Sequence, residues 1–164
     1  MKKGVSKSSN DYRQAAIKII DQQSTLTLAT AEDNCAWAAP VYYVFYKSAF
    51  FFFSNPDSKH IRQAMANDQV AATIHPHSTT WQGIKGLQMS GKVSSVRPGL
   101  TGIQAVRAYV GKFPFIRDFF EDGQAMDLIS FSKRFRANLY CFTPQLVYYL
   151  DNTVRFGFRA EVNL

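Results

Sequence analysis

The sequence predicts a single, mainly β domain: a small β-barrel with a few α-helices. About six short runs rich in β-branched and aromatic residues are separated by turn signals, which is typical of an all-β fold. The helices of about 10 to 15 residues that parallel βαβ units need are mostly absent. The run "FFFF" at residues 50–53 shows no alternation, so both faces of that strand must be covered. A chain of 164 residues is long enough to bury one such core.

We expect residues 1–9 to form a disordered tail and residues 10–164 to form the domain. Asn10 or Ser9 would cap a helix whose apolar face is made by Tyr12, Ala15, Ala16, Ile19 and Ile20. Residues 24–31 then alternate threonine with apolar residues, and "EDN" leads into the aromatic run of residues 35–47, which predicts a hairpin. Pro40 has no N–H group for a ladder, so its strand should be bulged or lie at a sheet edge.

The remainder of the chain should add short helices and further strands. Residues 58–66 predict a helix whose inward residues are Ile61, Ala64 and Met65. Strands are expected in "QVAATIHP" and "GLQMSGKVSSV". A helix should begin at Pro98 and pack through Ile103, Val106, Tyr109 and Val110. "QAMDLISFSKRF" predicts one more helix, and residues 136–152 predict two strands separated at Thr143 and Pro144, with a turn in "DNTVRFGFR".

The charge balance is compatible with several anionic partners. Nineteen Lys and Arg against twelve Asp and Glu give a formal charge of +7, which suits nucleic acid, an anionic surface or a phosphorylated ligand. The predicted strands are nearly free of charge, whereas a nucleic-acid groove would interleave basic and aromatic residues, so nucleic acid is disfavoured. The two cysteines form no CxxC pair, and no apolar run approaches the roughly 20 residues of a membrane span. We therefore expect a cytoplasmic protein without a membrane anchor.

The segment "SNPDSKH", residues 54–60, is the strongest candidate for a binding site. Ser54 and Ser58 offer hydroxyls, Lys59 and His60 offer charge, and the first amides of a helix are unpaired, which together suit a phosphate. The simpler alternative is a helix capped by Asp57 or Ser58 with Lys59 in solvent. Both interpretations stay open at this point.

Other positions give weaker signals. His75 and His77 share a strand face and would suit a metal, but no third ligand follows at a recognisable spacing, so no metal site is predicted. Trp81 lies in the predicted loop "STTWQG", where it would cover a planar ring or anchor the packing. No nucleophile triad or carboxylate pair is recognisable, so the catalytic residues stay unknown.

The order of "TLTLATA", "APVYYVFY", "FFFSNPDSKH" and "IKGLQMSGKV" resembles the pyridoxamine 5'-phosphate oxidase-like split barrels. "RAYVGKFP" and "DNTVRFGF" are similar to a narrower branch, the YhbP-like small proteins. The resemblance implies a Greek-key split β-barrel that binds FMN at a homodimer interface. It implies that the flavin ring lies along the backbone of Ala39, Pro40, Val41 and Tyr42. The strand end at Phe53 and the residues Ser54, Ser58, Lys59 and His60 would hold the phosphate.

The same resemblance implies ring contacts near Lys85 and Gly86, although a glycine stands where the oxidases have a glutamine. The Trp and Arg signature that the oxidases use for their pyridoxal substrate is not recognisable in residues 151–164, which argues against oxidation of pyridoxamine phosphate. We therefore predict a small FMN-dependent oxidoreductase of unidentified substrate. The alternatives are the same fold with haem, with a deazaflavin or without a cofactor, and a basic β-barrel that binds nucleic acid or another anion. The two-sided apolar strands "FFFF" and "VYYVFY" also predict a homodimer, which would cover them.

Overall fold

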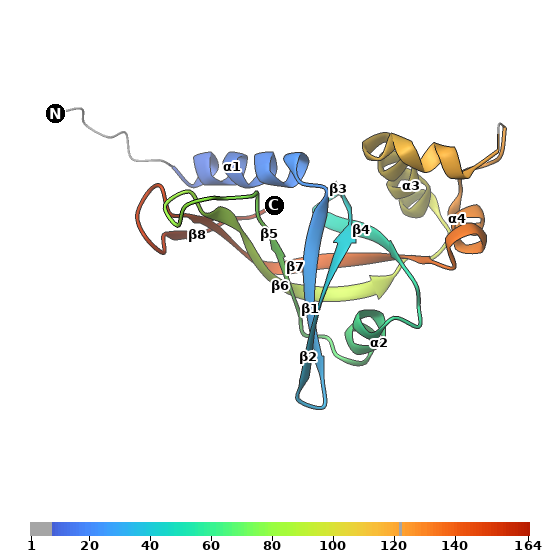
Figure 1. Ribbon diagram of the computed structural model, residues 1–164, viewed down its shortest axis with the longest axis horizontal. Coiled ribbons are helices and arrows are strands. Elements are labelled where there is room, and N and C mark those ends of the chain that lie inside the picture. Colours follow the sequence, from blue (N-terminus) through green and yellow to red (C-terminus); the bar gives the residue numbers. More distant parts are fainter. Residues whose placement is uncertain (1–7, 122) are drawn as a thin grey trace.

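A curled, antiparallel eight-stranded sheet forms the centre of the computed structural model, which describes residues 8–121 and 123–164. The strand order is β2-β1-β5-β6-β7-β4-β3, and β8 pairs with β7. The strands are β1 (Thr25–Glu32), β2 (Cys35–Tyr42), β3 (Val44–Tyr46), β4 (Ala49–Ser54), β5 (Val70–Ile74), β6 (Lys85–Ser95), β7 (Asn138–Asp151) and β8 (Arg159–Glu161). Figure 1 shows the sheet curling into a half-barrel from which the β1–β2 hairpin projects. The prediction of a mainly β barrel-like fold is confirmed.

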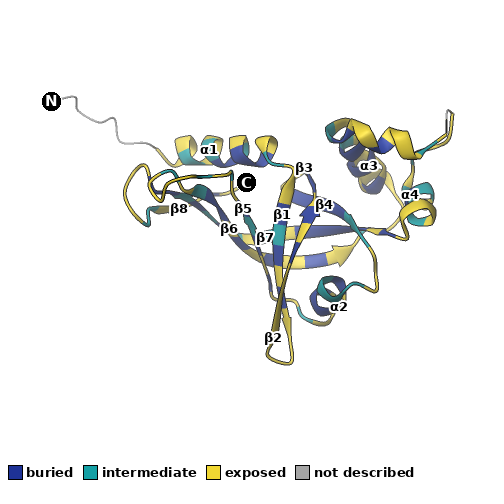
Figure 2. Ribbon diagram, in the orientation of Figure 1, coloured by how far each residue is buried: buried dark blue, intermediate teal, exposed yellow. Residues whose placement is uncertain are grey.

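The helices lie around this sheet. They are α1 (Ser9–Gln22), α2 (Lys59–Ala66), α3 (Leu100–Lys112), a 3₁₀ helix η1 (Pro114–Phe119) and α4 (Leu128–Phe135). In Figure 1, α1 runs along one side of the sheet, α2 lies beside the β1–β2 hairpin, and α3, η1 and α4 gather at the opposite end from β8. Figure 2 shows that α1 turns its buried residues toward the sheet.

Helix α1 begins earlier than predicted. Its N-cap is Ser8, whose hydroxyl accepts a hydrogen bond from Asp11 N–H while the Asp11 carboxylate accepts from Ser8 N–H at 2.7 Å. This reciprocal pair makes Ser8 a better cap than Asn10 or Ser9, because it satisfies two backbone donors at once. Ser8 and Ser9 therefore belong to the helix rather than to the tail, and residues 1–7 of the predicted tail lie outside the described residues.

The four phenylalanines of β4 separate two hydrophobic clusters. Phe50 and Phe52 join the cluster inside the curled sheet, whereas Phe51 and Phe53 face a second cluster built from α3, η1 and α4. Phe50, Phe51 and Phe52 are buried, as expected for a strand covered on both faces. The cover on the outer face is supplied by the chain's own helices, so this run needs no second subunit to hide it.

Strand β7 is one continuous strand, and the predicted pair of strands separated at Thr143 and Pro144 is wrong. Opposite it, Ser90 pairs with Leu146 but Gly91 pairs with Pro144, so the register shifts there and leaves an extra residue in a bulge. A Cβ on Gly91 would lie 2.9 Å from Pro144 Cα, so only glycine allows this close approach. The bulge lets a proline sit inside a strand without ending it.

Two inward positions are also corrected. Met65 on α2 and Ile103 on α3 are 45% and 52% exposed, whereas both were expected to pack inward. On α2, Gln63 is buried instead of Met65, at 3% exposed. The hydrogen bonds of its side-chain amide make this burial possible. The expected packing is confirmed for Ile61, Ala64, Val106, Tyr109 and Val110.

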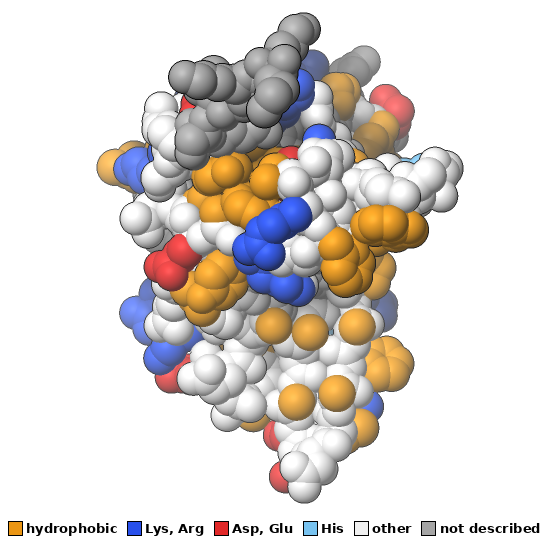
Figure 3. All heavy atoms as spheres, turned by 90° about the vertical axis from the view of Figure 1, so that its left-hand side faces the viewer, with side chains coloured by type: hydrophobic (Ala, Val, Ile, Leu, Met, Phe, Trp, Pro, Cys, Tyr) orange, Lys and Arg blue, Asp and Glu red, His pale blue; other side chains and the backbone are white. Residues whose placement is uncertain are grey.

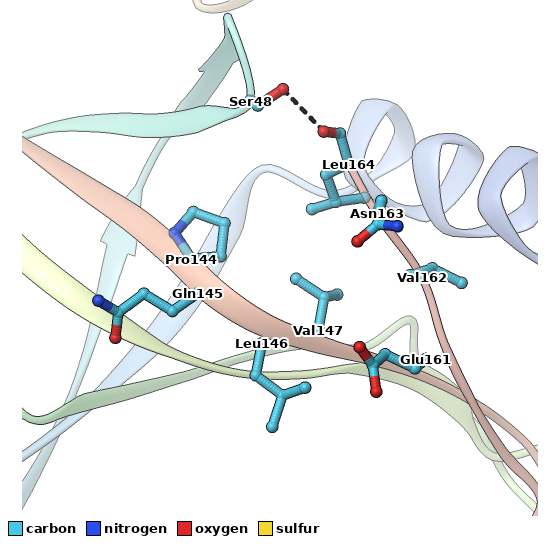
Figure 4. A pocket seen from close by; sticks show the side chains of 9 residues that line it. All are labelled: Ser48, Pro144, Gln145, Leu146, Val147, Glu161, Val162, Asn163 and Leu164. Atoms are coloured by element: carbon cyan, nitrogen blue, oxygen red, sulfur yellow. Dashed lines mark hydrogen bonds between the residues drawn. The ribbon is translucent and has the colours of Figure 1, made fainter.

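The segment after β8 ties three parts of the fold together. Val162 N–H donates to Val147 O at 3.0 Å, Ser48 Oγ donates to Leu164 O at 2.8 Å, and Arg13 Nε on α1 donates to Asn163 O at 2.9 Å. Figure 4 shows this segment beside β7, around a cavity of about 150 Å³. These bonds attach the segment after β8 to β7, to the β3–β4 turn and to α1.

Candidate cofactor site

Strand β2 has one open edge. Within the described chain it pairs through β1 alone, and Pro40 stands opposite Thr27 in an unbroken register. Tyr43 N–H donates to Ser24 O, and because bonded residues alternate along an antiparallel ladder, Pro40 and Tyr42 direct their backbone groups to the open side. The edge position predicted from Pro40 is confirmed, without a bulge. Ala39 and Val41 are buried, whereas the side chains of Pro40 and Tyr42 are exposed, as Figure 2 shows for most of β2.

The loop between β4 and α2 brings three predicted polar groups together. Ser54 Oγ lies 2.8 Å from His60 Nε2 and 3.4 Å from Ser58 Oγ, which is itself 3.4 Å from His60 Nε2. Ser58 is the N-cap of α2, but its hydroxyl donates to Asn55 O at 2.7 Å and makes no cap bond to the helix. The first turn of α2 therefore has no side-chain cap, which is the condition that an anion site needs.

The loop is shaped by a residue that the sequence did not single out. Asn55 Oδ1 accepts from Asp57 N–H at 2.8 Å, and Asn55 O accepts from Ser58 N–H at 3.1 Å. These two bonds form a tight turn between Ser54 and the helix. The available signal is the "NPDS" pattern itself, which is typical of such turns.

His60 contributes a neutral imidazole rather than a charge. Burial lowers the pKa of His60 below its usual value, because desolvation disfavours the charged ring. At neutral pH the ring is then a hydrogen-bond partner for Ser54, and the positive charge expected at this position is missing.

Lys59 turns away from the two serines. Its ammonium lies 3.3 Å from Cys35 Sγ and 4.6 Å from the centroid of the Trp37 ring, both on β2. Beside it, Gln63 Nε2 donates to Cys35 O at 2.9 Å, and Thr30 Oγ1 donates to Gln63 Oε1 at 2.7 Å. Sequence reasoning missed this link between α2 and the hairpin. The one signal for it is Thr30, a polar residue on the inward face of β1.

Phe53 lies at a different feature, an aromatic cavity of about 250 Å³ between β2, β4 and the helices α3, η1 and α4. The Phe53 ring stacks on Phe131 with centroids 4.4 Å apart, and the Tyr109 ring meets it edge-on at 5.1 Å. Tyr42 lines the same cavity. No single stretch of the sequence predicts this cavity, because its walls come from five separate elements.

Trp81, Lys85 and Gly86 lie far from the loop at Ser54. Lys85 pairs with Asp151 at one end of β7, and Ser54 pairs with Asn138 at the other. At about 3.3 Å per residue, a strand of 14 residues places the two ends roughly 40 Å apart along its length. Figure 1 shows the same separation, with β6 beginning near β8 and the β4–α2 loop at the opposite end. One chain therefore does not bring all the predicted site residues together.

Lys85 and Gly86 have local structural roles. Lys85 Nζ lies 3.8 Å from the buried carboxylate of Asp151, which also accepts from Tyr149 OH at 2.8 Å and Thr153 Oγ1 at 2.6 Å. Burial alone would raise the pKa of Asp151, but the hydrogen bonds from Thr153 and Tyr149 outweigh it and hold the pKa below its usual value. A Cβ on Gly86 would lie 2.7 Å from Ile74 O, so glycine is needed there for close strand packing.

Trp81 is 56% exposed and meets the Phe156 ring edge-on at 5.5 Å. Its carbonyl accepts from Asn152 Nδ2 at 2.8 Å, which fixes the loop to the β7–β8 turn. Among residues 8–121 and 123–164, no group of three or more His, Cys, Asp or Glu residues is placed to hold a metal ion. No helix in this part of the chain is long and apolar enough to cross a membrane.

A sequence model of the pyridoxamine 5'-phosphate oxidase family matches residues 13–126, more than half of the chain. The chain belongs to this family. A UPF0306 protein of Yersinia pestis is 31% identical over 99 residues, which cover 59% of this chain and 67% of the relative.

Two solved structures share the fold of this family member. A FAD-binding protein of Mesorhizobium loti aligns with a TM-score of 0.59 and 22% identity, over 82% of this chain and 90% of that protein. The haem storage protein HutZ of Vibrio cholerae aligns with a TM-score of 0.63 and 18% identity, over 82% and 90%. The split-barrel fold implied by the sequence is thereby confirmed.

Proposed function

We propose that this chain binds FMN and acts as a flavin-dependent oxidoreductase on a small molecule. The observation that carries the proposal is the convergence of Ser54, Ser58 and His60 at the uncapped start of α2, in a chain of the pyridoxamine 5'-phosphate oxidase family. Two hydroxyls and the amides of the first helical turn fit a phosphate. Lys59 supplies the charge when its flexible stem turns from Cys35 toward the loop.

The flavin ring lies along the open edge of β2 in this proposal. Pro40 directs its carbonyl to that edge, and because it has no N–H, a further strand cannot pair fully there. The Tyr42 carbonyl on the same edge accepts a hydrogen bond from Tyr109 OH at 3.5 Å. FMN, when bound, supplies the hydride and electron transfer chemistry. The protein positions the ring and holds the phosphate at the N-terminus of α2.

A homodimer follows if Trp81 and Lys85 also contact the cofactor, because they lie roughly 40 Å along the strand from the phosphate loop. A second chain would bring its own copies of these residues to the site. The exposed face of β2, β1 and β5 suits such a contact, because it carries a group of small apolar side chains at Ala29, Ala31, Ala36, Ala38 and Ala71. Figure 3 shows small hydrophobic side chains on an almost uncharged surface over the lower half of the molecule.

Titration of the protein with FMN and with riboflavin tests the phosphate site. A charge-assisted contact contributes about 1.5 to 3 kcal/mol, so Lys59→Ala should weaken FMN binding about tenfold or more and leave riboflavin binding almost unchanged. Ser54→Ala should act in the same direction with a smaller loss. Lys18→Ala, an exposed lysine on α1, is the matched control. Equal losses for both ligands would remove Lys59 from the phosphate site.

Haem is a second candidate cofactor, because the haem storage protein HutZ shares the fold. His75 and His77, exposed after β5, are the imidazoles available as axial ligands, since His60 is bonded to Ser54. Absorption spectra after incubation with FMN or haem separate the two proposals. Haem binding that is lost in the double variant His75→Ala and His77→Ala, with no FMN binding in the parent protein, would replace the flavin proposal.

A further inference from the structure

The aromatic cavity described above adjoins both parts of the proposed flavin site. Val44 on β3 pairs with Phe51 on β4, and continuing this register by two residues places Tyr42 opposite Phe53. Both residues line the cavity. Tyr42 belongs to the strand edge proposed for the ring, and Phe53 directly precedes Ser54. The cavity is therefore bounded by the strand proposed for the ring and by the last residue of β4 before the phosphate loop.

The walls are suited to an uncharged ring. Seven of the eight lining side chains are aromatic and the eighth is Ile116, so no lining residue carries a formal charge at neutral pH. Burial raises the pKa of the Tyr109 hydroxyl, which keeps it protonated. A charged ligand would lose its hydration here without gaining a partner.

The mouth differs from the closed core beneath it. Phe131 and Tyr109 at the base are 1% and 6% exposed, whereas Tyr42, Phe119 and Phe135 around the opening are 49%, 46% and 38% exposed. Phe119 and Phe135 are held edge-to-face at 5.5 Å, a geometry that leaves ring faces and edges available for a further aromatic group. The volume of about 250 Å³ is smaller than the roughly 300 to 1,000 Å³ of sites for drug-sized ligands.

We propose that this cavity binds uncharged, planar aromatic compounds of one or two rings, and that it is the substrate site beside the flavin. The binding itself depends only on the cavity. The role as a substrate site rests on the proposed flavin function.

The test uses 2-naphthol as the probe and 2-naphthoate as its charged counterpart, with binding to the cofactor-free protein measured by equilibrium dialysis. We expect saturable binding of one 2-naphthol per chain and at least tenfold weaker binding of 2-naphthoate. Phe119→Glu should reduce 2-naphthol affinity at least tenfold, because it places a charge at the mouth. Phe119→Leu, which keeps an apolar side chain, should reduce it about two- to tenfold through loss of the aromatic contact. Leu100→Glu, at an 81% exposed position on α3 outside the cavity, should bind like the parent protein.

Absence of saturable binding, equal affinity for the two probes, or equal losses in Phe119→Glu and Leu100→Glu would each overturn the proposal. The proposal would also be overturned if a second copy of the chain covered the mouth of the cavity. In that case Phe119→Glu would dissociate an oligomer, and the parent protein would bind no 2-naphthol. FMN titration of the same proteins keeps the two proposals distinct. Loss of 2-naphthol binding with FMN binding intact would reject the cavity alone, and 2-naphthol binding without FMN binding would reject the flavin proposal alone.

Discussion

At the scale of single residues, the buried imidazole of His60 gives the protein a pH-dependent stability. Burial lowers the folded-state pKa of His60 below the value of about 6.5 in an unfolded chain. At a pH between these two pKa values, the unfolded state binds more protons at His60 than the folded state does. The contribution of His60 to the free energy of unfolding is therefore fully present above about pH 6.5, and it is lost as the pH falls through the folded-state pKa. His60→Gln should therefore make the free energy of unfolding less dependent on pH below 6.5, as measured by urea denaturation between pH 5 and 7.5.

His75→Gln is the control for this experiment. His75 is exposed on the loop after β5, and its ring lies 3.4 Å from Pro76 O at the surface. The variant should keep the pH dependence of the parent protein. A steeper acid loss in His60→Gln than in the parent would mean that His60 does not carry the effect.

Lys85 is the second residue whose role the structure redefines. Its ammonium, 40% exposed, faces a carboxylate that is 1% exposed, so Lys85→Met leaves Asp151 with its hydrogen bonds but without its cation. We expect the free energy of unfolding to fall by about 0.5 to 1 kcal/mol, the upper part of the range for partly solvated pairs. Lys92→Met is the matched control, because Lys92 pairs with Asp68 at 2.6 Å but both partners are exposed. A larger loss in Lys92→Met would show that burial of the carboxylate does not decide the energy.

At the scale of elements, the bulge in β7 depends on one glycine of β6. A Cβ at Gly91 would collide with Thr143 O and Pro144 Cα, both of which are backbone atoms that cannot turn aside. Gly91→Ala should therefore lower the free energy of unfolding by about 1 to 3 kcal/mol or more. Gly111→Ala on α3 is the contrast, since its Cβ would meet open space and alanine favours a helix by about 0.5 to 1 kcal/mol. Chemical denaturation of the two variants should give changes of opposite sign.

Elements formed by interactions between neighbouring residues were predicted well from the sequence. Elements that depend on residues far apart in the chain were predicted less well. Strands β1 and β4 follow from local alternation and local apolarity, so they were predicted with nearly the right bounds. The predicted second strand of the hairpin, residues 35–47, is instead divided into β2 and β3, and β3 pairs with β4 rather than with β1. The break at Pro144 was wrong because a proline is tolerated in β7 only through Gly91, which lies 53 positions earlier in the sequence. No residue near Pro144 in the sequence indicates that Gly91 is its partner.

In the candidate site, too, contacts between residues close in sequence were predicted, and contacts between distant residues were not. Ser54, Ser58 and His60 lie within seven consecutive residues, so their convergence could be read from the chain itself. The direction of Lys59 toward Trp37 and the distance of Lys85 from the loop depend on how β2 and β6 are placed, which residue spacing does not give. The aromatic cavity was missed for the same reason.

At the scale of the whole molecule, the reason for expecting a dimer moves from β4 to the alanine face of β2, β1 and β5. The helices α3 and α4 already cover the outer face of "FFFF", whereas Ala38 and its cross-strand partner Ala29 are both exposed. Sedimentation equilibrium at micromolar concentration should give twice the chain mass of 18.6 kDa. Ala38→Glu should shift this to the monomer, because a buried carboxylate on both sides of a two-fold contact has no cation to pair with.

Gln14→Glu adds the same charge to the exposed surface of α1 and should leave the mass unchanged. A parent protein that sediments as a monomer would rule out both the dimer and a cofactor site shared between chains.

The proline on the open edge of β2 also affects how this protein behaves at high concentration. An exposed strand edge is a template on which a strand of another molecule can add, which is the first step of fibrous aggregation. Pro40 removes one donor from the middle of that edge, so a foreign strand cannot complete a ladder along it. The residue that we propose beside the flavin ring thus also disfavours uncontrolled polymerisation of the chain.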